Sequence, residues 1–493
     1  MKQKNLIYSL SGILLTSFGL NSCNNNSEDQ NIKNKSRPNI LWIVADDLGT
    51  DLGCYGNQLI KTPNLDKFAS EGAMYTNFFT VSAVSSPSRS SLITGMYPVS
   101  IESHQHRTQN KKPLRTGLFP ITKYFKDAGY FCSNGNFRNK ERPGKTDYNF
   151  IAKNLFDGTD WTQREKGQAF FAQIQINFPH RPFLRDSLNP INENDVKLPP
   201  YYPNHKIARQ DWALYLETIQ ILDNEVGKIL KRLEDEGLAE NTIIFFFGDQ
   251  GRPHVRAKQF LYDGGIKTPL LIRWNNNIEG GTINDDLVEN VDIGPTSMDL
   301  AGIKLPEYIQ GQSFMGKSKR KRDLIFSMRD RRDETVDRIR AIRTKDFKFI
   351  KNFYPDRPYT QFNAYKKQAY PVLTLMQLMF KNGELSKEQQ LFMADSRPQL
   401  ELYDLNTDPW ELNNLAYKPE YESLVVDMQI NLDEQISKYD QALYPEYAEE
   451  IIYAEELMKN RFQLQMNKKG LSAESTDEEI LEYWNKTLVP TKR

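Results

Sequence analysis

The sequence is poor in cysteine and histidine, and it has no excess of charge of either sign. It holds three cysteines and five histidines, while 64 basic residues balance 64 acidic ones over 493 positions. So few cysteines exclude a disulfide framework, and we expect Cys54 and Cys132 to be buried free thiols or one isolated pair. Zero net charge without a basic run does not predict a nucleic-acid partner.

The longest apolar run lies at the N-terminus, over residues 6–20. It is too short and too weakly flanked for a membrane-spanning helix, and it predicts a signal peptide over residues 1–22. The tetrapeptide LNSC, which ends at Cys23, resembles a lipobox and predicts a lipid anchor on that cysteine. We therefore expect a disordered tether over 23–36, in an exported bacterial lipoprotein anchored in the outer membrane that faces the periplasm or the cell surface.

Beyond the tether, the sequence alternates strands with helices. The segments 39–47 and 243–247 have the continuous apolar character of strands that are covered on both faces. Apolar residues at helical spacing predict a long helix over 207–236. This alternation predicts an α/β fold with a mixed, mostly parallel central sheet. Further helices are predicted near 63 and 121, and further strands near 74, 131, 170–176 and 270.

The length and a change of pattern divide the chain. A chain of this length is too long for one ordinary core. The segments 340–353 and 399–405 predict an antiparallel sheet, and 446–470 predicts an amphipathic helix with a charged outer face. We predict a catalytic domain over 37–322 and a smaller α+β C-terminal subdomain over 323–493. We expect the charge run RDRRDETVDRIR (329–340) to be a solvated face, or arginines that contact an anionic polymer.

Carboxylates follow two of the predicted strands. Asp46 and Asp47 end one strand, and Asp249 and Gln250 end another. Ligand sites in open α/β sheets lie beyond the carboxyl ends of the strands. One such aspartate is as readily a turn residue or a helix cap. Two aspartate-containing ends in one sheet instead favour a hard cation such as calcium, which takes carboxylate and amide oxygens.

A serine-rich stretch, VSAVSSPSRSSLITGMYP (81–98), is either a flexible connection or a reaction centre. Its segment Ser85-x-Pro-Ser-Arg89 with Leu-x-Thr-Gly matches the signature of the type I sulfatases, in the alkaline-phosphatase-like superfamily. PNILWIVADDLG (38–49), the segment from 248 to 274 and ELYDLNTDPWELNNLA (401–416) match other family motifs. The chain therefore resembles this family from about 37 to 416. Its segments SIESHQHRTQNKK (100–112) and FGDQGRPH (247–254) resemble those of bacterial polysaccharide sulfatases, including ulvan-active enzymes and relatives of heparan N-sulfatases.

The resemblance implies a modified nucleophile. Ser85 would be oxidised by a serine-type maturase to formylglycine (3-oxoalanine), whose hydrate attacks the sulfur of a sulfate ester and expels the sugar alcohol. Its second hydroxyl then allows sulfate to leave. Arg89 would hold this side chain beside one calcium ion, preferred to magnesium, that polarises the sulfate. The metal ligands would be Asp46, Asp47, Ser85, Asp249 and Gln250.

Other roles carry over from the family motifs. Lys258 matches the sulfate-binding lysine, and His180, in NFPHRPF, matches the histidine that protonates the leaving oxygen. Gly144-Lys145 matches the family's Gly-Lys pair, so Lys145 would bridge sulfate and formylglycine. Asp147 stands where the family has histidine, which leaves the elimination base open.

The remaining histidines and one arginine are candidates for contact with the sugar. His104, His106 and Arg107 follow the serine-rich stretch, and His254 follows the second acidic strand end. Arginine binds carboxylate and sulfate in bidentate fashion, which suits an anionic sugar. The alternatives are a solvated polar loop for the first three and a turn cap for His254.

We predict a sulfatase that acts on a sulfated polysaccharide or its oligosaccharides, with ulvan (sulfated rhamnose) ahead of a heparan-type glycosaminoglycan, including its N-sulfate. One alternative is a phosphoester or phosphonate hydrolase of the same superfamily, often with two metals, which five histidines disfavour. The other is a catalytically inactive sugar-binding lipoprotein.

Overall fold

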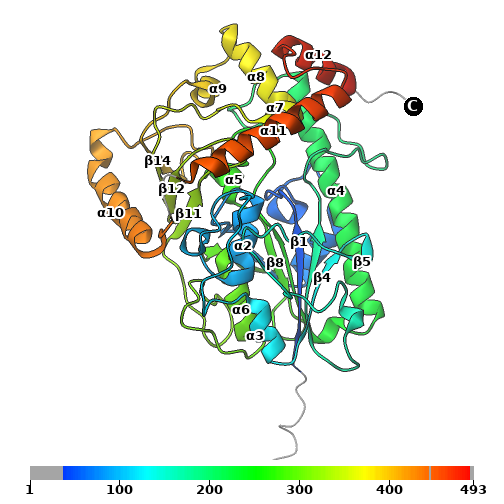
Figure 1. Cartoon of the computed structure of the whole chain (residues 1–493). Helices are drawn as coiled ribbons and strands as arrows, with labels where there is room; N and C mark the ends of the chain where they lie inside the picture. The colour runs from blue at the N-terminus through cyan, green and yellow to red at the C-terminus, as the bar shows by residue number, and fades with distance from the viewer. Residues whose placement is uncertain (1–36, 443–445, 489–493) are drawn as a thin grey trace, which may run out of the picture. The chain divides into compact units, whose positions relative to one another are not determined.

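The computed structural model describes residues 37–442 and 446–488, and from Pro38 onward they belong to one compact unit. Its centre is an eight-stranded sheet in the order β5-β4-β6-β1-β7-β8-β2-β9 (Figure 1). The neighbours from β4 to β7 are parallel, while β8 runs antiparallel to both β7 and β2. The strands are β1 (Asn39–Ala45), β2 (Ala73–Tyr75), β4 (Phe131–Asn136), β5 (Asn139–Pro143), β6 (Phe170–Ile176), β7 (Thr242–Gly248), β8 (Leu270–Arg273) and β9 (Thr282–Asn284).

Helices cover both faces of this sheet. Alternate residues of β1 point to opposite sides, and they pack into two separate cores. Leu41 and Ile43 pack in one core with α1 and α4, whereas Ile40 and Trp42 pack in another with α2, α3 and α6. The mixed, mostly parallel sheet between helical layers confirms the predicted α/β class. The helices are α1 (Pro63–Ser70), α2 (Ser85–Thr94), α3 (Ile121–Asp127), α4 (Lys206–Asp235) and α6 (Ile293–Leu300).

A second, four-stranded sheet is antiparallel throughout, in the order β11-β12-β13-β14. Helix α10 packs on it, α11 packs on α7 around Met458 and Phe462, and α12 packs on α8 (Figure 1). The predicted antiparallel sheet and amphipathic helix are both present, while the division of the chain at residue 323 stays a prediction. The elements are β11 (Ile325–Arg329), β12 (Ile339–Arg343), β13 (Phe347–Asn352), β14 (Leu400–Asp404), α7 (Ala364–Ala369), α8 (Pro371–Lys381), α10 (Glu422–Tyr439), α11 (Ala448–Lys468) and α12 (Asp477–Thr487).

The remaining elements are short. Strands β3 and β10 form a parallel pair beside the main sheet. Helix α5 lies between β7 and β8 in the sequence, and α9 follows α8. Their bounds are β3 (Phe78–Phe79), β10 (Val288–Glu289), α5 (Asp263–Ile266) and α9 (Lys387–Gln390), with 3₁₀ turns at Gly53–Tyr55, Pro98–Ile101, Trp161–Gln163, Ala239–Asn241, Asn290–Asp292, Leu391–Met393 and Pro419–Tyr421.

The charge run at 329–340 is not a solvated face, so that prediction is wrong. Arg340 is fully buried and pairs with Asp330 and Asp440, at 3.1 and 2.8 Å. Asp337, equally enclosed, pairs with Arg329 at 3.2 Å. The run is buried because its charges are matched in opposite pairs, which is the condition for enclosing them.

Two further expectations concern thiols and the membrane. Cys54 and Cys132 are free thiols, the first half-buried and the second fully buried. Among the residues described, no helix combines the length and apolar character needed to cross a membrane. The predicted signal peptide, tether and acylated Cys23 lie outside the described residues.

Candidate active site

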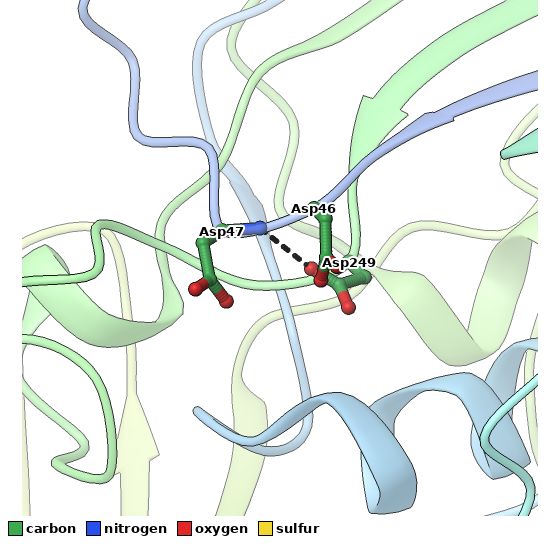
Figure 2. Close-up of side chains that lie close together, drawn as sticks. All are labelled: Asp46, Asp47 and Asp249. Atoms are coloured by element: carbon green, nitrogen blue, oxygen red, sulfur yellow. Dashed lines mark hydrogen bonds between the residues drawn. The ribbon is translucent and has the colours of Figure 1, made fainter. Parts of the chain in front are cut away.

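Two neighbouring strand ends bring the predicted acidic residues together. β1 and β7 are parallel and in register, with Ala45 beside Gly248, so the residues that follow them meet at one edge of the sheet. Oxygen atoms of Asp46, Asp47 and Asp249 all lie within 4.8 Å of one another, and all three side chains are buried (Figure 2). The backbone amide of Asp47 donates to Asp249 Oδ1 at 2.9 Å, which fixes the second strand end against the first.

The serine-rich stretch is a buried helix rather than a flexible loop. Ser85 is the first residue of α2, and its Oγ donates to Asp46 Oδ1 at 3.4 Å. Pro87 is tolerated because it lies in the first turn, where the backbone N–H needs no helical acceptor. The helix N-terminus directs free N–H groups and positive potential toward the acidic cluster, which favours an anion there.

Three cations compensate the three carboxylates. Arg89, one turn into α2, donates from Nε to Asp249 Oδ2 at 2.8 Å. Lys145 Nζ lies 2.8 Å from Asp46 Oδ2, and Lys258 Nζ lies 2.6 Å from Asp47 Oδ2. The contacts come from three different segments, so the tertiary fold assembles a neutral cluster of fixed geometry.

A close backbone contact places Lys145. A Cβ atom on Gly144 would lie 2.4 Å from the carbonyl oxygen of Gly135 and 2.6 Å from Cγ of Gln175. Only glycine fits at such a separation. The Gly-Lys pair is therefore held against the end of β4, and the lysine reaches the carboxylates from there.

The carboxylates of the cluster differ in proton affinity. Burial alone would raise the pKa of Asp46, but Lys145 and Arg89 outweigh it and hold the pKa well below its usual range. Burial dominates at Asp249 and raises its pKa to about 6, although Arg89 opposes the shift. A cation bound beside Asp249 would therefore stabilise the ionised form of this carboxylate.

The donor set fits a hard divalent cation. Gln250 donates from Nε2 to Asp47, while its Oε1 is buried and has no hydrogen-bond partner among the described residues. A buried acceptor without a partner is costly, and a cation beside it would satisfy it. Three carboxylates and one amide carbonyl match calcium's preference for oxygen ligands. Among the described residues, the group of possible metal ligands consists of these three carboxylates and includes no cysteine or histidine, the ligands that softer metals favour.

His180 lies beside the acidic cluster, and one of its ring nitrogens is hydrogen-bonded to the backbone. Its Nδ1 lies 2.6 Å from the carbonyl of Arg181, so this nitrogen carries the hydrogen. Nε2 is 3.8 Å from Asp47 Oδ2 and 3.5 Å from the hydroxyl of Tyr365. Burial and the nearby Lys258 lower the pKa of this imidazole, which leaves it neutral with Nε2 directed to the site.

The position of the family histidine is filled by an ion pair. Asp147 accepts two hydrogen bonds from Arg107, each of 3.1 Å, and this half-exposed arginine covers the site. Burial alone would raise the pKa of Asp147, but Arg107 and Lys145 lower it to about 2. Nδ1 of His106 pairs with Asp333 at 2.9 Å, and burial lowers the pKa of this histidine to about 4. A solvated loop is therefore excluded for His106.

Two of the predicted residues lie away from the carboxylates. His104 is buried beside Gln105, 3.3 Å from its amide nitrogen. His254 is enclosed by aromatic rings, the nearest being Trp212 and Tyr215 with centroids at 4.5 and 4.8 Å. His254 is enclosed on the sides these rings cover, whereas His104 lines a separate cavity beside Glu102 and Thr108.

Three residues that sequence analysis did not select lie at the site. Gln175, at the end of β6, accepts from Arg89 Nη1 at 2.6 Å. Tyr365 and Asp333 come from the C-terminal half and complete the wall. Gln175 carried a signal, because Gln173 and Gln175 interrupt an otherwise apolar strand. The other two stand in no motif, and only the tertiary fold identifies them.

Comparison with known proteins identifies the family that this chain matches. The sulfatase family model matches residues 38–303, and a model of the C-terminal part of N-sulphoglucosamine sulphohydrolase matches 254–391. An ulvan-active sulfatase of Formosa agariphila is 35% identical over 84% of this chain and 77% of its own length. The human N-sulphoglucosamine sulphohydrolase is 25% identical over 79% and 88%. A protein solved with its substrate D-glucosamine-2-N,6-O-disulfate shares the fold, with a TM-score of 0.59, 21% identity and coverage of 82% and 98%.

Proposed function

The chain belongs to the sulfatase family, and from that premise we propose that it removes sulfate groups from a sulfated polysaccharide or its oligosaccharides. The family and the named relatives support a sulfuric ester hydrolase, as predicted. Ulvan is the first candidate polymer because the relative at 35% identity is named for activity on it. A heparan-type glycosaminoglycan, including its N-sulfate, is second, on the 25% identical human relative.

One observation carries this proposal. Ser85 begins α2 within hydrogen-bond distance of Asp46, with Lys145 and Lys258 on the adjacent carboxylates. A tetrahedral dianion such as sulfate needs several cationic donors around one nucleophile. The two ammonium groups and the first turn of α2 supply such donors, and the nucleophile stands at their centre.

The modified serine and the metal ion belong to the proposal. We infer that a serine-type maturase converts Ser85 to formylglycine, whose hydrate supplies the attacking hydroxyl. Asp46, Asp47, Asp249 and Gln250, with the side chain at position 85, would hold one calcium ion. When bound, the cation polarises the sulfate and lowers the pKa of the nucleophile.

The chain's own side chains orient the ester and move protons. Arg89 holds Asp249 and approaches Asp46, so it keeps the carboxylates beside Ser85. Neutral His180 has an unprotonated Nε2, because its hydrogen is on Nδ1 and is donated to a backbone carbonyl. An anionic substrate would raise the pKa of this imidazole, which would then take up a proton and give it to the leaving sugar oxygen.

The test is the substitution Ser85→Ala in matured protein. We expect sulfate release from sulfated oligosaccharides to be abolished with the melting temperature retained, because the change removes one hydroxyl. Mass spectrometry of the wild-type protein should show residue 85 lighter by two hydrogen atoms. Ser91→Ala is the matched control, since this buried hydroxyl on the same helix has no hydrogen-bond partner in the described part of the chain. Full activity of Ser85→Ala would refute the mechanism.

We also propose that the protein is a lipoprotein attached through Cys23 and exported across the inner membrane. The apolar run over 6–20 and the LNSC tetrapeptide support this proposal. Replacing the cysteine by serine should move the protein from the membrane to the soluble fraction. A membrane-bound Cys23→Ser variant would refute the anchor.

A further inference from the structure

A cavity adjoins the candidate active site. It has a volume of about 440 Å³ and is walled by the loop after β6, by α4 and α7, and by the C-terminal helices α11 and α12, which lie together in Figure 1. Its size is in the range of small-molecule sites. Helices α11 and α12 lie beyond residue 391, where the second of the two matched family models ends. Part of the cavity wall thus comes from outside the segments that the family models match.

Tyr365 forms the partition between the cavity and the acidic cluster. Its ring lines the cavity, its hydroxyl is 3.5 Å from His180 Nε2, and Lys258 Nζ is 5.6 Å from the ring centroid. Arg181, which follows His180 in sequence, lines the same cavity. A ligand that extends from the catalytic residues past this tyrosine therefore enters the cavity.

The lining combines aromatic faces with a lysine that has no acidic partner. Phe183, Tyr483 and Trp484 line the cavity together with Tyr365. Lys469 Nζ lies over the ring of Trp484, at 4.1 Å from the centroid, and its hydrogen bond goes to the carbonyl of Gln368. Among the described residues it forms no salt bridge, since the one lining carboxylate, Asp211, is held by Arg181 at 2.6 Å.

Within the described ranges, one buried group in this lining lacks a hydrogen-bond partner, and the half-buried Lys469 lacks an acidic one; a ligand could supply both. Nε1 of Trp484 is buried and has no hydrogen-bond acceptor in the part of the chain that the structure describes. Burial, with Arg181 adding to it, lowers the pKa of Lys469 to about 8. An anion beside the ammonium group would favour its charged form, and aromatic faces pack against the apolar faces of a sugar ring.

From this geometry we propose that the cavity is a subsite for an anionic sugar ring, the neighbour of the sugar that carries the reacting sulfate. The inference rests on the proposed function and names a part of its substrate: an oligosaccharide with a carboxylate or a second sulfate on the adjacent ring. Lys469 would bind that charge, and Trp484 would pack on the ring and donate from its indole nitrogen.

The test compares a sulfated tetrasaccharide prepared from ulvan with the corresponding sulfated monosaccharide. We expect Lys469→Gln to lower kcat/KM for the tetrasaccharide about tenfold, equivalent to about 1.4 kcal/mol, and to lower it far less for the monosaccharide. Lys469→Arg should restore most of the loss, because it keeps the charge. Lys459→Gln, at an exposed position of α11, should leave both rates unchanged. Equal losses on the two substrates, or no loss on the tetrasaccharide, would overturn the subsite.

A binding measurement separates this inference from the proposed function. Calorimetry with the Ser85→Ala protein measures tetrasaccharide affinity without turnover, and adding Lys469→Gln or Trp484→Ala should weaken it. If matured wild-type protein releases no sulfate, the proposed function fails, whereas unweakened binding in these double variants refutes the subsite alone. A carboxyl-reduced tetrasaccharide that keeps its sulfates identifies the group at Lys469: weaker binding assigns it a carboxylate, and unchanged binding assigns it a sulfate.

Discussion

His254 is a titratable residue in buried surroundings that disfavour its protonated, charged form. Neither ring nitrogen has a hydrogen-bond partner among the described residues, and Trp212, Tyr215 and Phe183 surround the ring. Burial, with Arg181 and Arg252 adding to it, lowers the pKa of this histidine well below its ordinary value. Asp211 lies 3.8 Å away but is engaged by Arg181. The residue is therefore neutral in the folded protein.

This burial makes the protein less stable in acid. Below about pH 6.5 the unfolded chain protonates His254 while the folded chain does not, so the free energy of unfolding falls as pH falls, by up to about 1.4 kcal/mol per pH unit. We expect His254→Phe to flatten this dependence between pH 7 and 5, because phenylalanine does not titrate and leaves no nitrogen unpaired. Thermal unfolding at a series of pH values measures the slope. An unchanged slope would contradict the assignment.

The residues of the candidate site divide into those that sequence could identify and those that it could not. Asp46, Asp249 and Ser85 stand at strand ends or a helix start, where local pattern and motif agree, and the structure brings them together. Tyr365 lies 185 positions from the histidine that it approaches. Such a contact depends on how α7 packs, which no local pattern encodes.

Among the elements, α11 ties the loop that carries Arg107 to the C-terminal region. Both carboxylate oxygens of Glu450, in the first turn of the helix, accept from the backbone, at 2.8 Å from Gln109 N and 3.0 Å from Asn110 N. Glu446, just before the helix, pairs with Arg331 at 2.6 Å. These contacts hold the 102–112 loop in place over the site.

We expect Glu450→Ala to lower the free energy of unfolding by about 1–3 kcal/mol, because it leaves two backbone donors without their acceptor. The loosened loop should also raise KM for sulfated oligosaccharides more than it changes kcat, since Arg107 loses its fixed position. Urea unfolding and steady-state kinetics measure the two effects. Glu449→Ala is the matched control, because Glu449 is exposed on the same turn. A KM equal to that of the wild type would show that the loop does not depend on α11.

The charge run at 329–340 is the segment whose burial the sequence pattern predicted least well. The segment 329–340 is predicted as a solvated face because charged residues are seldom buried, yet its charges are enclosed. Their partners Asp440 and Glu446 come from a hundred or more residues away. Local composition shows the charges but not the distant groups that neutralise them. Buried strands such as β1 and β7 are read correctly because their apolar runs need no such partner.

For the molecule as a whole, the acidic cluster is where the central sheet, α2 and the segments bearing Lys145 and Lys258 meet. Three buried carboxylates there are balanced by Arg89 and the two lysines. The fold is thus neutral at this point without a metal, but both lysines are then engaged with carboxylates. A divalent cation would take over part of that compensation and release ammonium donors for a sulfate group.

Calcium should therefore stabilise the whole chain. A ligand that binds the folded state alone adds about 2.7 kcal/mol to the free energy of unfolding at a hundredfold excess over its Kd, so the melting temperature of chelator-treated protein should rise with calcium concentration. Magnesium should raise it less, because it demands stricter octahedral geometry and retains its water. The double variant Asp46→Asn/Asp249→Asn should lose the calcium response, whereas Asp235→Asn, at an exposed position of α4, should keep it. Differential scanning fluorimetry across calcium concentrations measures the shift, and a wild-type melting temperature independent of calcium would refute the proposed metal site.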